Sequence, residues 1–241
     1  MNHKDAFEPT CCFKQFELSD KRCGMKIGTD GVLLGAWAKM PMSGGVIIDV
    51  GAGSGLISLM LAQRYDDVCR IYALEIEPGA LADLKENTNR SHWAKRIEAY
   101  GGDFRDFEGR ADLIVSNPPF FSNGEHSPEA ARALARHGGG LSPVTLIDFA
   151  AEHLNPNGRL SMIFPCEPLP EVEMRSVLKR LELRRICYVT TCYGKAPSRI
   201  LAEFSPTSGA IERSELSIYT SERRYTSEYV ELTKDFYHNI K

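Results

Sequence analysis

A buried strand that leads directly into a glycine-rich turn and an apolar helix constrains the fold of this chain more than any other stretch. Val46–Val50 is a continuous run of apolar residues apart from Asp49. Glycines follow at every second position, at Gly51, Gly53 and Gly55. Leu56, Ile57, Leu59, Met60 and Leu61 then indicate an apolar helix. A strand, a glycine turn and a helix in this order are typical of the start of a nucleotide-binding βα unit.

The spacing of these glycines narrows the kind of ligand. They form a G-x-G-x-G pattern with Leu56 in the sixth place, where the dinucleotide fingerprint G-x-G-x-x-G needs glycine, so pyrophosphate binding is disfavoured. No Gly-Lys-Ser/Thr follows, so the turn is not a Walker loop. Ser54 is not expected to be a nucleophile, because Ala52 replaces the first glycine of the G-x-S-x-G elbow.

Strands and helices alternate along the rest of the chain. We expect a Rossmann-like, doubly wound, mostly parallel α/β sheet of seven strands over residues 45–241, preceded by a small β/α extension over residues 1–44. A short N-terminal strand is predicted at 13–18 and a closing helix at 227–237. The last two strands, 199–204 and 211–219, are expected to form a hairpin around 206–209. In such sheets the ligand lies at the carboxyl ends of the strands, near the point where strand order reverses.

Acidic side chains follow the second and third predicted strands. Glu75 ends the strand that begins at Arg70, and a carboxylate there can accept hydrogen bonds from both ribose hydroxyls of an adenosine. Asp103 follows the third strand and could accept from an adenine amine, with Phe104 against the ring. The pattern therefore favours adenosine at this edge of the sheet.

The fourth predicted strand is followed by an unusual tetrapeptide, Asn117-Pro118-Pro119-Phe120. The prolines end the strand and remove two N–H donors, leaving backbone carbonyls as acceptors beside the Asn117 amide oxygen. Phe120 adds a flat apolar face. Amide oxygen, carbonyl and aromatic ring together suit a planar group that carries an NH2.

Composition limits the cellular compartment in which the protein is expected and the kinds of partner that it can bind. The formal net charge is −3, so a nucleic-acid partner must meet a local basic patch. Seven cysteines in no C-x-x-C spacing, with no signal segment, indicate a reducing, cytoplasmic setting. No apolar run approaches the roughly 20 residues of a membrane span. No Cys/His set has the spacing of a metal site. The oligomeric state is not determined by the sequence, and a monomer is favoured.

These motifs, in this order, resemble the class I S-adenosylmethionine-dependent methyltransferases that act on exocyclic or amide nitrogens. The stretch Arg22–Trp37 is similar to the N-terminal signature of the bacterial tRNA adenine-N6 methyltransferases, which modify the adenine 3′ of the anticodon in valine tRNA. The resemblance implies that S-adenosylmethionine lies over Gly51 and Gly53. It assigns the cofactor site as a whole to Lys26, Thr29, Asp49, Gly51, Gly53, Gly55, Glu75, Asp103, Phe104 and Asn117.

The expected chemistry is methyl transfer without a metal. Asn117 and Pro118 would accept the two hydrogens of an adenine amine, which points the nitrogen lone pair at the methyl group, while Phe120 stacks on the base. Helix N-terminal N–H groups near Thr29, with Lys26, would lie at the methionine end of the cofactor. The cationic side chains expected to contact tRNA are Arg22, Arg132, Arg136, Lys195 and Arg199.

Three other functions remain open at this point. Guanine-N2 methylation of ribosomal RNA and N5 methylation of a protein glutamine both use an Asn-Pro-Pro-aromatic motif, and both would keep the same cofactor. A non-catalytic RNA-binding scaffold belongs to another class, and the intact Asn117–Phe120 motif argues against it.

Overall fold

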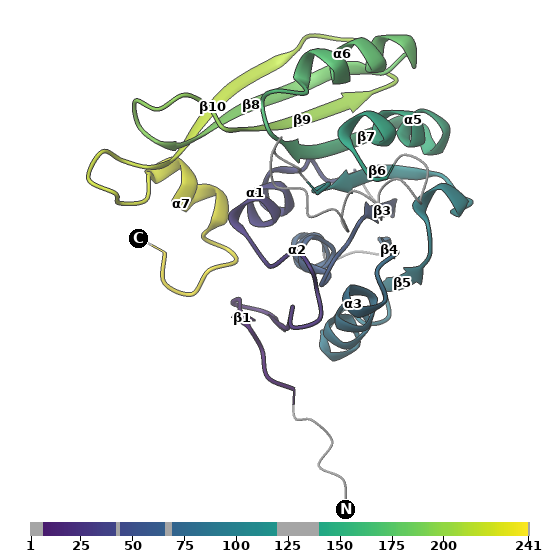
Figure 1. The fold of residues 1–241 in the computed structure, drawn as a ribbon, viewed down its shortest axis with the longest axis vertical. Helices are drawn as coiled ribbons and strands as arrows, with labels where there is room; N and C mark the ends of the chain where they lie inside the picture. Colours follow the sequence, from purple (N-terminus) through teal and green to yellow (C-terminus); the bar gives the residue numbers. More distant parts are fainter. Residues whose placement is uncertain (1–6, 42–43, 66–68, 120–139, 241) are drawn as a thin grey trace, which may run out of the picture.

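The computed structural model describes residues 7–41, 44–65, 69–119 and 140–240. Within these residues, eight strands form the main sheet, in the order β10-β8-β9-β7-β6-β3-β4-β5 (Figure 1). From one edge to the other they are β10 (Glu212–Tyr219), β8 (Glu182–Cys192), β9 (Arg199–Ser205), β7 (Leu154–Phe164), β6 (Ala111–Ser116), β3 (Val46–Val50), β4 (Arg70–Glu75) and β5 (Ile97–Gly101). Only β9 runs antiparallel to its neighbours.

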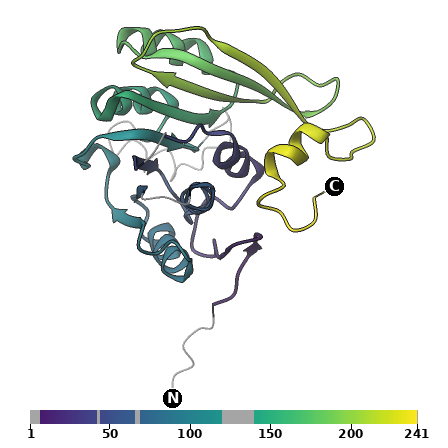
Figure 2. The ribbon, with the colours of Figure 1, turned by 180° about the vertical axis from the view of Figure 1, so that it is seen from behind.

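Helices cover both faces of this sheet, as Figures 1 and 2 show from opposite sides. One apolar core packs α1 (Thr29–Trp37), α2 (Leu56–Arg64) and the start of α7 (Ser227–Thr233) against the sheet. The other packs α5 (Pro143–His153) and α6 (Leu169–Leu178) against the opposite face. The central strands are buried on both sides, which explains why β3 is almost wholly apolar in sequence.

Helix α3 (Pro78–Arg90) follows β4, and a short 3₁₀ helix, η1 (Phe104–Asp106), follows β5. Residues 11–18 form a small antiparallel ladder of β1 (Cys11–Cys12) and β2 (Glu17–Leu18), where one short strand was predicted. Phe13, Phe16 and Leu18 of this region are buried in the core that also contains α1 and α2. The N-terminal extension therefore packs directly on the core that α1 and α2 form with the sheet.

Three details of the sequence prediction are wrong. Strand β10 is an eighth strand, one more than the seven expected, and it pairs in parallel with β8. The predicted hairpin between β9 and β10 does not form, because β9 is already hydrogen-bonded to β7 on one edge and to β8 on the other. The closing helix α7 is also shorter than expected and ends at Thr233.

The chain order identifies the switch point of the sheet. Strands β4 and β5 lie on one side of β3, and the chain then returns to place β6 on the other side. The carboxyl ends of β3 and β6 are tied together, since Ser116 Oγ donates a hydrogen bond to the Val50 carbonyl at 2.7 Å. The expected mostly parallel, doubly wound sheet is confirmed, and its crevice lies where the sequence motifs end. None of the helices in the described part of the chain is long and apolar enough to cross a bilayer.

Candidate active site

The glycine turn after β3 has one open position. Gly51, Gly53 and Gly55 all have positive φ angles, of 69°, 57° and 89°. A Cβ on Gly51 would come within 2.5 Å of Leu141, and one on Gly55 within 2.8 Å of Leu84, so these two glycines serve packing. A Cβ on Gly53 would meet no heavy atom of the described residues within 4 Å. The open space beside Gly53 is the place where a ligand can approach the backbone.

Glu75 lies beside this turn at the end of β4. Its side chain is buried, and Oε2 accepts a hydrogen bond from the Gly53 N–H at 2.8 Å. Oε1 accepts from the Glu77 N–H, also at 2.8 Å. Each carboxylate oxygen has a second lone pair, so the same group can accept from two hydroxyls. The Glu75 carboxylate is thus fixed beside Gly53, where it could accept hydrogen bonds from the two hydroxyls of a ribose.

Asp49 of β3 stabilises the glycine turn through hydrogen bonds to α2. It is fully buried, and Oδ2 accepts from the Ser58 N–H at 3.0 Å and from Ser58 Oγ at 2.7 Å. Among the described residues, Oδ1 has no hydrogen-bond partner. Burial raises the pKa of Asp49 to about 7, although the bonds from Ser58 act in the opposite direction. Asp49 thus connects β3 to the first turn of α2 and holds the glycine turn between them.

Asn117 presents a second buried acceptor at the end of β6. Its Oδ1 is buried and has no hydrogen-bond partner among the residues that the structure describes. A buried amide oxygen left unpaired costs about 1–3 kcal/mol, so such an atom is typical of a site that receives a donor from a ligand. Pro118 is buried and Pro119 partly exposed, whereas Phe120 lies outside the described residues.

Asp103 and Phe104 lie where β5 ends, but their side chains are used within the protein. Asp103 Oδ1 accepts from the N–H of Arg105 at 3.0 Å and caps η1, and the two side chains form an ion pair. Phe104 is buried and packs edge-to-face on Phe149, with ring centroids 5.3 Å apart. The more open apolar side chain is Ile76, which is 51% exposed directly after Glu75. Sequence reasoning missed Ile76, whose signal is an apolar residue between two acidic ones beyond a strand.

The N-terminal motif brings a helix start to the carboxyl edge of the sheet. Helix α1 begins at Thr29 after Gly28, and within the described part of the chain no side-chain cap bonds its first N–H groups. Those groups remain suited to a carboxylate. Lys26 does not extend freely, because its ammonium donates to the carbonyls of Asp20 at 2.5 Å and Lys21 at 3.3 Å. The structure therefore gives Lys26 a role in closing the loop before α1.

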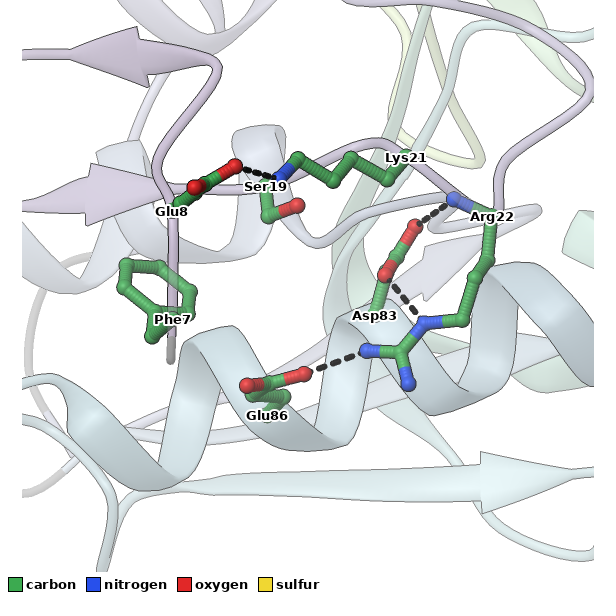
Figure 3. Close-up of a pocket in the computed structure, with 7 residues that line it drawn as sticks. All are labelled: Phe7, Glu8, Ser19, Lys21, Arg22, Asp83 and Glu86. Atoms are coloured by element: carbon green, nitrogen blue, oxygen red, sulfur yellow. Dashed lines mark hydrogen bonds and ion pairs between the residues drawn. The ribbon is translucent and has the colours of Figure 1, made fainter. Parts of the chain in front are cut away.

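Helix α3 fastens the N-terminal segment to the glycine turn. The buried Asp83 accepts from the backbone N–H of Arg22 at 2.7 Å and from its Nε at 2.6 Å, and Arg22 also pairs with Glu86 (Figure 3). Asn87 Nδ2 donates to the carbonyls of Ser19 at 2.7 Å and Ser54 at 2.8 Å. One polar face of α3 thus holds both the segment that precedes α1 and the turn that follows β3.

The predicted RNA-contacting cations differ in their surroundings. Arg22 is held by the two acidic residues of α3, beside a cavity of about 360 Å³ whose lining includes none of the predicted cofactor residues (Figure 3). Arg199 pairs with Asp30 at the start of α1, with 2.8 Å between Nε and Oδ2. Lys195 is exposed on the loop between β8 and β9. Arg132 and Arg136 lie outside the described residues. Within the described ranges, no group of three or more His, Cys, Asp or Glu residues could hold a metal.

Comparison with known proteins gives a consistent result. The profile of the family described as methyltransferase small domain matches residues 27–184. A tRNA1(Val) (adenine(37)-N6)-methyltransferase of Tolumonas auensis is 39% identical over 227 residues, which are 93% of this chain and 95% of that protein. A protein of the same name from Porphyromonas gingivalis is 41% identical, with 93% of each chain covered.

Solved structures share the fold. A predicted O-methyltransferase from Agrobacterium tumefaciens has a TM-score of 0.67 at 16% identity, over 88% of this chain and 99% of that one. A ribosomal protein L11 methylase from Lactobacillus delbrueckii has a TM-score of 0.53 at 19% identity, over 74% of this chain and 77% of that one. At such identities the likeness concerns the fold alone, and that fold is the one expected from the sequence.

Proposed function

The chain belongs to the methyltransferase small domain family, and on this premise we propose that it transfers a methyl group from S-adenosylmethionine to N6 of adenine 37 in tRNA1(Val). Relatives that carry this activity in their names are 39% and 41% identical over nearly the whole chain. The single structural observation that carries the proposal is the buried Asn117 Oδ1, which has no hydrogen-bond partner among the described residues. Asn117 follows β6, the strand that pairs with β3 beside the glycine turn.

The residues around the turn fit S-adenosylmethionine. The open face of Gly53 allows the ligand to approach the backbone, and the Glu75 carboxylate beside it can accept from both ribose hydroxyls. Ile76 supplies an apolar surface for the adenine, and the uncapped start of α1 suits the methionine carboxylate. When bound, S-adenosylmethionine supplies an electrophilic methyl group on a sulfonium.

The protein prepares the acceptor nitrogen. An adenine amine is a weak nucleophile because its lone pair is delocalised into the ring. Asn117 Oδ1 and the Pro118 carbonyl would accept its two hydrogens, which turns the lone pair out of the ring plane and toward the methyl group. An unpartnered acceptor is suited to this role because no internal hydrogen bond must be broken before the base arrives.

The base must leave its stack to reach Asn117. Adenine 37 is unpaired in the anticodon loop, so extruding it costs less than extruding a base from a duplex. We further propose that Phe120 stacks on the extruded ring and that Lys195 contributes to the RNA surface. The reaction is placed in the cytoplasm, where tRNA is modified, and the protein is expected to act as a monomer.

The test uses purified protein, S-adenosylmethionine labelled on its methyl group and a set of unmodified tRNA transcripts. We expect label in tRNA1(Val) alone and N6-methyladenosine as the modified nucleoside after digestion. A transcript with guanosine at position 37 is the matched control and should stay unlabelled. Label in ribosomal RNA or in protein, with none in tRNA, would replace this proposal by guanine-N2 or glutamine-N5 methylation.

A further inference from the structure

A second cavity lies at the carboxyl ends of β8 and β10. It has a volume of about 380 Å³, and its lining combines aromatic, cationic, hydroxyl and acidic side chains. The residues that line it include Tyr188, Thr190, Tyr193, Lys195, Glu215, Ser217 and Glu228. We infer that this cavity binds a second unpaired nucleotide of the RNA substrate, a short distance along the strand from the methylated adenine. The inference rests on the proposed function and adds to it a site that helps to select the RNA.

The register of the sheet places this cavity on the edge where Asn117 lies. Tyr188 pairs with Ile200 of β9, and Ile200 pairs with Phe164 of β7. Phe164 lies just beyond Met162, which pairs with Ser116 at the end of β6. Tyr188 is therefore level with the turn that follows Ser116, and the loop after β8 rises above that level. An RNA strand that enters the active site across this edge can reach the cavity without leaving the protein surface.

The separation suits a nearby nucleotide of the same RNA. Strands β7 and β9 lie between β6 and β8, so three interstrand spacings of about 4.8 Å separate the two sites by at least about 14 Å. At about 3.4 Å per stacked nucleotide, this distance corresponds to about four nucleotides. A loop of unpaired nucleotides around the target adenine spans such a distance, whereas a single bound nucleoside does not.

The rim of the cavity carries the groups that bind a base and a phosphate. Tyr193 is 49% exposed, and an exposed aromatic ring is the usual platform on which an unpaired base stacks. Gly194 follows with φ of 79°, and this tight turn is closed by a hydrogen bond from the Lys195 N–H to the Cys192 carbonyl at 3.1 Å. Tyr193 and Lys195 thereby lie two positions apart on one closed turn. Unlike Arg22 and Arg199, Lys195 has no ion-pair partner within the described residues.

The hydroxyl and acidic side chains of the lining favour the hydrogen-bonding edge of a base over a phosphate. Thr190 and Ser217 face each other with 2.6 Å between their hydroxyl oxygens, and the carboxylates of Glu215 and Glu228 line the same space. Carboxylates repel a phosphate but accept hydrogen bonds from the amino groups of adenine, guanine and cytosine. The arrangement therefore suits a base that stacks on Tyr193 and donates to the carboxylates, with its phosphate at Lys195.

The first experiment compares steady-state kinetics of the full-length protein and its variants on tRNA transcripts. Tyr193→Ala should raise KM for RNA about 5-fold or more, because an aromatic platform contributes that much per base. KM for S-adenosylmethionine and kcat at saturating RNA should not change. Tyr193→Phe keeps the ring and should behave like the wild type. Lys195→Ala should reduce the slope of log affinity against log salt by about 0.7, and Lys85→Ala, an exposed lysine on α3, should leave it unchanged.

A second experiment identifies the nucleotide. In anticodon stem-loop transcripts, each unpaired nucleotide other than the target is replaced in turn by an abasic residue. At one position the replacement should raise KM of the wild type and of Tyr193→Phe, but not that of Tyr193→Ala. If Tyr193→Ala matches the wild type on every RNA while methylation of adenine proceeds, this inference is wrong and the proposed function stands. If the wild type methylates no RNA, the proposed function fails first and the inference fails with it.

Discussion

The backbone N–H of Gly53 donates a hydrogen bond to Glu75 Oε2 at 2.8 Å, which joins the glycine turn after β3 to the end of β4. The two motifs that sequence reasoning selected separately are therefore in direct contact. This bond holds the carboxylate beside Gly53, the glycine of the turn whose Cβ position no described residue fills. A ligand at Gly53 would meet an acceptor that is already oriented, so little ordering is needed on binding.

Glu75→Ala should weaken S-adenosylmethionine binding about 10- to 100-fold, because hydrogen bonds to a charged group are worth about 1.5–3 kcal/mol. Isothermal titration calorimetry of the RNA-free protein measures the effect directly. Glu98→Gln, on the exposed side of β5, is the matched control and should bind normally. Equal dissociation constants for Glu75→Ala and the wild type would remove Glu75 from the cofactor site.

Asn117→Ala should separate catalysis from stability. Loss of the amide acceptor should lower kcat about 100-fold or more, as the loss of one oriented polar group in an active site commonly does. S-adenosylmethionine should still bind, and Tm should stay the same or rise, since the deleted oxygen has no partner among the described residues. Single-turnover methylation and thermal unfolding provide the two measurements. A variant that loses activity only because it unfolds would show that Asn117 acts in folding instead.

The contacts of α3 give a prediction about folding. Asn87→Ala removes a buried amide that serves Ser19 and Ser54 together, leaving their backbone groups unpaired, so we expect a loss of about 1–3 kcal/mol. Glu86→Gln on the same helix removes only a partly exposed partner of Arg22 and should cost less than about 1 kcal/mol. Urea unfolding of both variants measures the difference. Equal losses would mean that α3 does not fasten the N-terminal segment through Asn87.

The sequence predicted the ends of the strands well, because there the signal is local. A strand, its terminal polar residue and the following turn are adjacent in sequence, so the ends of β3, β4 and β6 were predictable. Contacts between distant segments were not, and Asn87 illustrates this, because nothing in the sequence of α3 says that its amide reaches Ser19 and Ser54. Phe104 shows the same limit, since its position after β5 was correct while its burial against Phe149 depends on α5.

The periphery of the sheet was harder to predict for a related reason. Strands β9 and β10 have the composition of strands, but their partners depend on which edges remain free. Both strands pair with β8, which binds β9 in antiparallel orientation on one edge and β10 in parallel orientation on the other. Sequence proximity favoured a hairpin, whereas β9 lies between β7 and β8 and has no free edge, so the last strand pairs with the far edge of β8.

Asp49 should make the stability of the protein depend on pH in an unusual direction. Its folded-state pKa lies near 7, above the ordinary value of 3.8, because burial penalises the charged carboxylate. Between about pH 4 and pH 7 the unfolded chain therefore binds fewer protons at this position than the folded protein, and stability falls as pH rises. Asp49→Asn keeps an acceptor for Ser58 and cannot ionise. The free energy of unfolding of the wild type, measured relative to this variant, should decrease from pH 4 to pH 7 and then level off. A constant difference across that range would show that Asp49 is ionised in the folded protein at low pH, with a proton donor near Oδ1.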